Sequence, residues 1–72
     1  MDNDIKRRIG LKISAIRREK GFSQIKLAEL CDLNFNYISR IELGNANFTI
    51  NTLIKIAKAL ECSVCEFFIF EF

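Results

Sequence analysis

Three cysteines are the residues of this 72-residue chain best suited to metal or redox chemistry. Cys62 and Cys65 have the two-residue spacing found in zinc and dithiol sites, and Cys31 lies well before them. The chain contains no histidine and no fourth cysteine, so a closed tetrahedral zinc site would need a carboxylate or a second chain. We therefore expect structural cysteines, no metal and no cofactor, with a redox-sensing pair as the alternative.

The sequence argues against two broad classes of function, enzymes and membrane proteins. Without histidine there is no ordinary serine or cysteine triad, and the chain has no glycine-rich phosphate loop or paired carboxylates, so we expect no enzymatic activity. No apolar run approaches the roughly 20 residues of a membrane-spanning helix. Residues 1–8 are charged where a signal peptide turns apolar, so we expect a cytoplasmic protein with no membrane partner.

The basic residues have a distribution that suits a polyanion. Residues 5–26 contain eight basic side chains and one acidic side chain, a net charge of +7. Residues 41–72 contain two basic and four acidic side chains, a net charge of −2. One part of the chain is therefore suited to nucleic acid, and the alternative interpretation is a solvated helix face.

Apolar periodicity and helix-end signals predict three helices that would carry this charge. A first helix over residues 4–20 would bury an isoleucine at every third or fourth position and end at a glycine. Ser23 is a suitable N-terminal cap for a second helix, and Asn34 is one for a third helix over residues 35–43. The break between these two helices is so short that they must cross steeply, so residues 22–44 are predicted to form a helix-turn-helix.

Two further helices are predicted in the rest of the chain. Thr49 can cap a fourth helix over residues 50–60, with all three of its isoleucines on the buried face. The sequence SVCE at residues 63–66 fits a capping box and predicts a short fifth helix. No strand pattern, repeat or linker competes with this interpretation. The expected fold is all-α, with residues 1–72 forming a single domain that is a compact five-helix bundle.

Three segments of the chain, IRREKGFSQIKLAEL, NYISRIELG and TLIKIAKAL, stand in the order and spacing of a known family. They resemble the lambda-repressor-like helix-turn-helix domains of Cro and Xre-type transcriptional regulators over nearly the whole chain. The resemblance implies that the third helix enters the DNA major groove and that dimers read two half-sites about one helical turn, roughly 34 Å, apart. The implied partner is a double-stranded DNA operator with palindromic half-sites, and no small-molecule effector is expected.

The resemblance assigns DNA contacts to side chains in and around the helix-turn-helix. The base-contacting positions of the third helix are occupied by Phe35, Asn36, Tyr37 and Arg40. Arginine can bind guanine, and asparagine adenine, by paired hydrogen bonds. The phosphate-contacting positions are occupied by Ser23, Gln24, Asn34, Asn45 and Asn47. For the asparagines, helix capping and loop formation are the alternative roles, and Phe35 could instead pack on the second helix.

Two further features concern the scaffold. Arg17 and Glu42 resemble a family pair that ties the first helix to the end of the third, and we interpret them as a scaffold pair. Asp32 replaces the glycine usual in the turn, and Glu61 replaces a usual glycine or asparagine. We expect the turn at Asp32 to adopt the left-handed conformation with some strain.

The final segment, FFIFEF at residues 67–72, holds more aromatic side chains than one helical turn can bury. An exposed apolar patch of this kind usually marks an interface, and a self-complementary one would give a two-fold homodimer. The predicted dimer interface consists of Val64, Phe68, Phe70 and Phe72.

The expected function is sequence-specific binding of double-stranded DNA by a small dimeric transcriptional regulator. The resemblance extends to the controller proteins of restriction-modification systems, which are bare domains of this kind. The alternative is a protein-interaction or antitoxin-type module that uses the same bundle, with DNA binding secondary.

Overall fold

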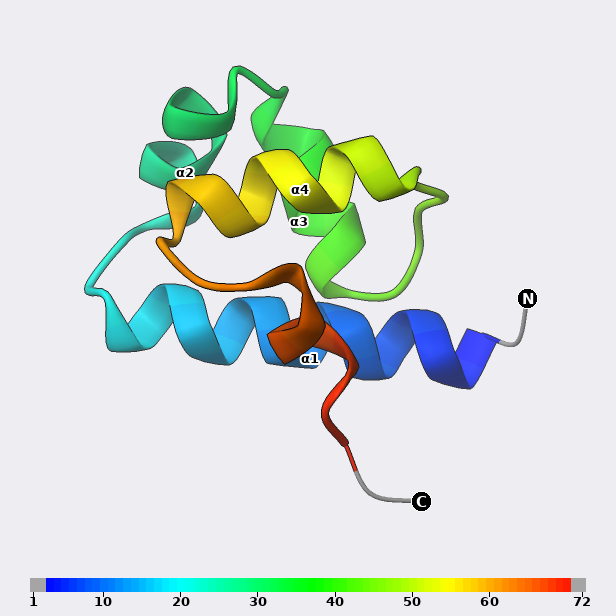
Figure 1. Ribbon diagram of the computed structural model, residues 1–72. Helices are drawn as coiled ribbons and strands as arrows, with labels where there is room; N and C mark the ends of the chain where they lie inside the picture. The colour runs from blue at the N-terminus through cyan, green and yellow to red at the C-terminus, as the bar shows by residue number, and fades with distance from the viewer. Residues whose placement is uncertain (1–2, 71–72) are drawn as a thin grey trace.

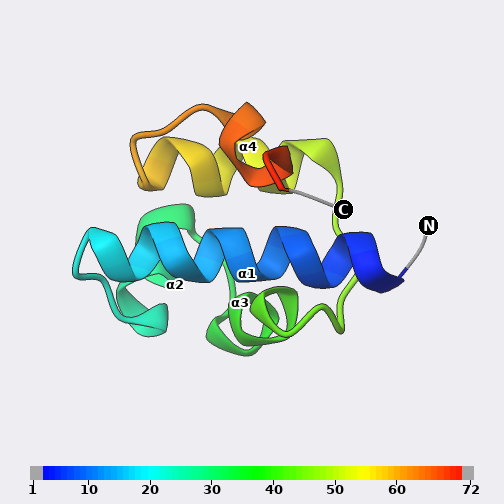
Figure 2. The same ribbon diagram turned by 90° about the horizontal axis from the view of Figure 1, so that it is seen from below.

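The computed structural model describes residues 3–70, which form four α-helices and one 3₁₀-helix. The helices are α1 (Asn3–Glu19), α2 (Gln24–Cys31), α3 (Phe35–Glu42), α4 (Ile50–Ala59) and the 3₁₀-helix η1 (Val64–Phe68). The long helix α1 lies along one side of the molecule, below α4 in the view of Figure 1. Figure 2, seen from below, shows α1 in front of the other helices, with α2 and α3 to one side of it in this view and α4 and η1 to the other. Within the described residues no helix is long and apolar enough to cross a membrane.

The predicted caps begin three of the helices. The Ser23 hydroxyl accepts a hydrogen bond from the Lys26 amide at 2.9 Å at the start of α2. The Asn34 side-chain oxygen accepts from the Asn36 amide at 2.7 Å at the start of α3. At the start of α4, Thr49 accepts in the same way. These bonds satisfy amides that the helices leave unpaired, and the predicted starts of α2, α3 and α4 are confirmed.

The fifth helix differs from the prediction, so the expected five-helix bundle is corrected to four α-helices and a 3₁₀-helix over residues 3–70. A capping box requires the Ser63 hydroxyl to accept from the Glu66 amide. In the structure the hydroxyl accepts from the Cys65 amide, at 3.3 Å. The Glu66 amide instead donates to the Ser63 carbonyl at 3.0 Å, which is the three-residue bond of a 3₁₀-helix. Because this bond uses the Glu66 N–H, the hydroxyl bonds one residue earlier.

One hydrophobic core joins all five helices. Its largest side chains, each less than 2% exposed, are Phe67, Ile9, Ile13, Leu27, Ile38, Ile41, Leu53, Ile56 and Leu60. The expected burial of all three α4 isoleucines is wrong, because Ile50 is 60% exposed and Ile54 is 36% exposed. Helix α4 packs mainly against α2 and η1, and it buries only the stripe that faces them.

Glycine allows α1 to approach α3 closely. A Cβ atom at Gly10 would lie 2.4 Å from the Ile41 carbonyl oxygen and 2.6 Å from that of Glu42. Gly44, which follows α3 with φ of 79°, also lies close to α1, since a Cβ there would be 2.8 Å from the Cα of Arg7. These two contacts fix α3 against α1 through backbone atoms, which cannot adjust as side chains do.

Two residues other than glycine have left-handed backbone. Asp32, at the end of α2, and Glu61, just after α4, both have φ of 56°. At each position the chain reverses out of a helix, and the next residue's amide bonds back into that helix: Leu33 to Ala28 and Cys62 to Ala57, both at 3.0 Å. The expected left-handed turn at Asp32 is therefore confirmed, with the strain that this region imposes on residues with a side chain.

Candidate nucleic-acid interface

Helix α3 has one buried face and one exposed face. Ile38 and Ile41 are at most 1% exposed and lie in the core. Asn36 and Arg40 are exposed and four residues apart, so they lie one above the other on the outward face. Phe35, at the start of the helix, is 43% exposed. The outward face therefore carries an amide, a guanidinium and an aromatic ring within about two turns.

Tyr37 is held against the loop that follows α3. Its side chain is half-buried, and its hydroxyl donates to the Asn47 carbonyl oxygen at 2.7 Å. The Asn47 side-chain oxygen in turn accepts from Lys6 of α1. Tyr37 is one of the four predicted base-contacting residues. Its hydroxyl hydrogen is already used in the bond to the loop, although its oxygen can still accept a hydrogen bond.

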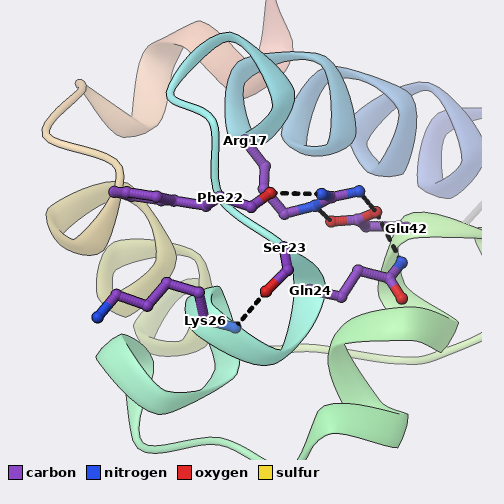
Figure 3. A network of polar contacts seen from close by, with 6 residues as sticks. All are labelled: Arg17, Phe22, Ser23, Gln24, Lys26 and Glu42. Atoms are coloured by element: carbon purple, nitrogen blue, oxygen red, sulfur yellow. Dashed lines mark hydrogen bonds and ion pairs between the residues drawn. The ribbon is translucent and has the colours of Figure 1, made fainter.

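A buried polar network holds α1, α2 and α3 together (Figure 3). Arg17 faces Glu42 in a bidentate pair, with Nε 2.7 Å from Oε2 and Nη2 3.0 Å from Oε1. The remaining arm, Nη1, donates to the Phe22 carbonyl at 2.7 Å. The two charged side chains are only 9% and 5% exposed, which makes this a buried ion pair with satisfied partners. The predicted scaffold pair is thus an ion pair between α1 and the last residue of α3.

Gln24 joins the same network from the first residue of α2. Its amide nitrogen donates to Glu42 Oε1 at 2.9 Å, and Figure 3 shows it approaching that carboxylate from the side opposite Phe22. One amide hydrogen is used in this bond, which leaves the second for a further acceptor. The contact with Glu42 was not expected from the sequence, because it depends on how α2 and α3 cross.

The other predicted phosphate-contacting residues lie at the ends of α2 and α3. The oxygens of Ser23 and Asn34 are used as helix caps, so the Ser23 hydroxyl hydrogen and the Asn34 amide group are the donors that remain. Asn45 is exposed, and its backbone amide donates to the Arg40 carbonyl at 2.8 Å. Asn34 thus lies at the start of α3, Asn45 and Asn47 lie in the loop after its end, and Ser23 lies at the start of α2.

Lys6 and Gly10 are residues that the sequence reasoning missed. Lys6 bonds to a residue 41 positions away, and no local signal could have indicated that contact. Gly10 did have a signal, because a glycine inside a helix is destabilising by about 1 kcal/mol relative to alanine and usually has a packing reason.

The cysteines do not gather into a site. All three are free thiols; Cys31 is buried, Cys62 half-buried and Cys65 exposed. Burial raises the pKa of the Cys31 thiol to about 11, although nearby Lys55 opposes the shift. Burial, with the charge of Glu66, also raises the pKa of Cys62. Both shifts reduce the reactive thiolate. Residues 3–70 contain no group of three or more potential metal-ligating side chains of the His, Cys, Asp and Glu types.

The predicted dimer surface is only partly exposed. Phe68 is 43% exposed, Val64 is half-buried, and Phe72 lies outside the described residues. Phe70 is half-buried, with its ring centroid 5.8 Å from the Arg8 guanidinium carbon. Ile69, which was not among the predicted residues, is 57% exposed. The outward apolar side chains of this segment are thus Phe68 and Ile69.

The short helices α2 and α3 cross at a tight turn, and α3 is exposed along one polar face. This geometry defines a helix-turn-helix protein. The helix-turn-helix family HTH_3 matches residues 5–67, and the chain therefore belongs to this family of DNA-binding transcriptional regulators. The resemblance drawn from the sequence is confirmed.

Several relatives are control proteins. The control protein C.BamHI of Bacillus amyloliquefaciens is 46% identical over 61 residues, which cover 83% of this chain and 75% of that protein. C.MunI of a Mycoplasma species is 40% identical over 67 residues, which cover 92% of this chain and 90% of that protein. Among solved structures, the restriction-modification controller C.AhdI of Aeromonas hydrophila has a TM-score of 0.84 and 31% identity, with 86% of this chain and 94% of that chain covered.

Proposed function

We propose that the protein is a restriction-modification controller that binds a palindromic double-stranded DNA operator as a homodimer, with α3 in the major groove. The observation that carries the proposal is the outward face of α3, where Asn36 and Arg40 stand one turn apart on a helix fixed by the core and by the Arg17–Glu42 pair. A helix held in this way can present side chains to base edges without itself rearranging. The similarity to several control proteins supports the regulatory role.

The base contacts follow from the chemistry of the exposed side chains. Arg40 can donate two parallel hydrogen bonds to guanine, and Asn36 can pair with the adenine edge. Phe35 can contact a thymine methyl group, and Tyr37, whose hydroxyl is directed to the loop, has the smaller share of direct readout. We assign sequence preference chiefly to Asn36 and Arg40.

The phosphate contacts surround this face. The proposed residues are Ser23, Gln24, Asn34, Asn45 and Asn47. Their neutral donors would fix the position of the domain on the duplex and add little salt dependence. Gln24 has the added support of the helix N-terminus, where backbone amides favour an anion.

Dimerisation would use the segment after α4. Phe68 and Ile69 present apolar surface there, and a two-fold axis through this surface would place two copies of α3 for adjacent half-sites. Occupancy of the operator would then follow protein concentration, since each dimer must assemble before it binds.

Ile69→Gln tests the dimer by sedimentation. Ile25→Gln is the matched control, because Ile25 of α2 is also 57% exposed and lies outside the proposed interface. We expect Ile69→Gln to sediment as a monomer at micromolar concentration while Ile25→Gln remains a dimer. A wild type that is itself monomeric under these conditions would refute the dimer.

Selection on random duplex DNA tests the function as a whole. The wild type should enrich a palindrome with half-sites one helical turn apart. Arg40→Ala should weaken binding by about 1–3 kcal/mol and relax preference at one base pair, whereas Gln24→Ala should weaken all sequences alike. Arg18→Ala removes the same charge from an exposed site on α1 and should leave the base preference unchanged. Unaltered preference in Arg40→Ala would refute the assignment of α3, and no enrichment by the wild type would favour the protein-interaction alternative.

A further inference from the structure

A polar pocket lies between the start of α1 and the loop after α3. It is lined by Lys6, Arg7, Leu43, Gly44, Asn45, Ala46 and Asn47. Figure 1 shows this loop running beside the N-terminal half of α1, and the close approach of Gly44 to the Arg7 backbone holds the two walls together. The pocket therefore joins segments that are far apart in the sequence and adjacent in space.

The lining of this pocket is suited to an anion. Two of the seven lining residues are cationic, two are amides and none is acidic. The Asp4 carboxylate lies 3.9 Å from Arg7 Nη2 and forms a closer contact with Arg8, at 2.8 Å. The Arg7 side chain is 69% exposed, so its guanidinium can turn toward a ligand at the mouth of the pocket.

The pocket is also connected to α3. Lys6 donates to the Asn47 side-chain oxygen, and the Asn47 carbonyl accepts from Tyr37 of α3. Because the oxygen of the Asn47 amide faces Lys6, its NH₂ group supplies the donors for any further contact. An anion held by Lys6 and Asn47 would thus be fixed relative to α3 through Tyr37.

We infer that Lys6 and Arg7 bind a phosphate of the DNA backbone in this pocket and so provide the charged anchor that the neutral phosphate contacts around α3 lack. The inference rests on the proposed function and extends it to α1, to which no DNA contact has been assigned. A phosphate suits the site because its several oxygens can accept from an ammonium, a guanidinium and an amide at once. A cationic anchor differs from the amide contacts in one measurable respect, because it releases a counterion when DNA binds.

The test is the salt dependence of affinity for the selected operator duplex. Lys6→Gln and Arg7→Gln should each reduce the slope of log affinity against log salt by about 0.9, which corresponds to roughly eightfold weaker binding at 0.1 M salt and little change when extrapolated to 1 M. Sequence preference should be unchanged. Lys58→Gln is the control, since Lys58 is exposed on α4 and lines a different pocket with α2; its slope should match the wild type.

A second arm identifies the phosphate. Single operator phosphates are replaced by neutral methylphosphonates. At the phosphate that Lys6 contacts, the replacement should weaken binding of the wild type and should not weaken binding of Lys6→Gln any further. Arg7→Gln keeps the test decisive if Lys6→Gln folds poorly, because the Arg7 side chain is mostly exposed. If the wild type selects an operator but its slope of log affinity against log salt equals that of both variants, the inference alone is overturned. If the wild type selects no sequence, the proposed function is overturned and this inference with it.

Discussion

Arg17→Met should remove a large part of the stability of the fold. The substitution deletes the cation of the buried pair and leaves the Glu42 carboxylate, 5% exposed, with the Gln24 amide as its only donor within residues 3–70. Leaving one charge of a buried pair without its partner costs about 3–5 kcal/mol. A domain of 72 residues has a total stability of about 4–11 kcal/mol at typical values per residue. The variant should therefore unfold at a much lower urea concentration, with an unchanged m-value.

The double variant Arg17→Met with Glu42→Leu separates the charge from the packing. With both charges removed no carboxylate is left stranded, and apolar replacement of a buried pair is often neutral or stabilising. The Phe22 carbonyl still loses the bond from Arg17, which costs roughly 1 kcal/mol. The double variant should thus recover at least about 2 kcal/mol relative to Arg17→Met in urea unfolding followed by circular dichroism.

Arg7→Met provides the comparison for this cycle. Arg7 is 69% exposed and its ion pair with Asp4 is 3.9 Å long, so its loss should cost less than about 1 kcal/mol. The reasoning would be refuted if Arg17→Met cost no more than Arg7→Met. It would also be refuted if the double variant were as unstable as the sum of the two single variants, because the buried charges would then not be coupled.

Four further predictions concern the backbone and the thiols. Asp32→Gly should raise the free energy of unfolding by about 1 kcal/mol, because the left-handed φ of 56° strains a residue with a Cβ; a decrease in urea unfolding would contradict this. Gly10→Ala should lower the stability by roughly 1–3 kcal/mol, since its Cβ would meet the Ile41 carbonyl at 2.4 Å, and an unchanged Tm would show that α1 can move away. A thiol reagent at neutral pH should modify Cys65 well before Cys31, as peptide mapping by mass spectrometry would show; equal rates would mean that the core opens readily. The pKa of Cys31 is raised from 9.0 to about 11 on folding, so its contribution to stability is fully present below pH 9 and is lost as the pH rises toward about 11.

The ends of the helices were predictable because their signals are local. Ser23, Asn34 and Thr49 each accept from an amide two or three residues ahead, and such a bond depends only on the residue type and the adjacent backbone. The same reasoning was wrong at Ser63. There the choice between an α-helix and a 3₁₀-helix rests on which amide the Ser63 carbonyl accepts from, and a capping motif does not determine it.

Contacts between helices were less predictable. The outward positions of α3 were assigned from the family resemblance, and the burial of Ile38 and Ile41 on the opposite side of the helix agrees with them. The bond from Gln24 to Glu42 and the link from Lys6 to Asn47 required the relative placement of whole helices, to which no spacing rule applies. The exposure of Ile50 has the same origin, since a helical stripe is buried only where a neighbouring element covers it.

For the proposed contact of Gln24 with a DNA phosphate, the bond from Gln24 to Glu42 has an entropic consequence. A glutamine side chain that is free in solution loses rotamer freedom when it binds, at a cost of about 0.5–1.5 kcal/mol. Here the first amide hydrogen holds the side chain against a carboxylate that is itself fixed by Arg17. In the proposed contact the second hydrogen would donate from a side chain that is already held in place, so most of this ordering would take place when the chain folds and not when DNA binds.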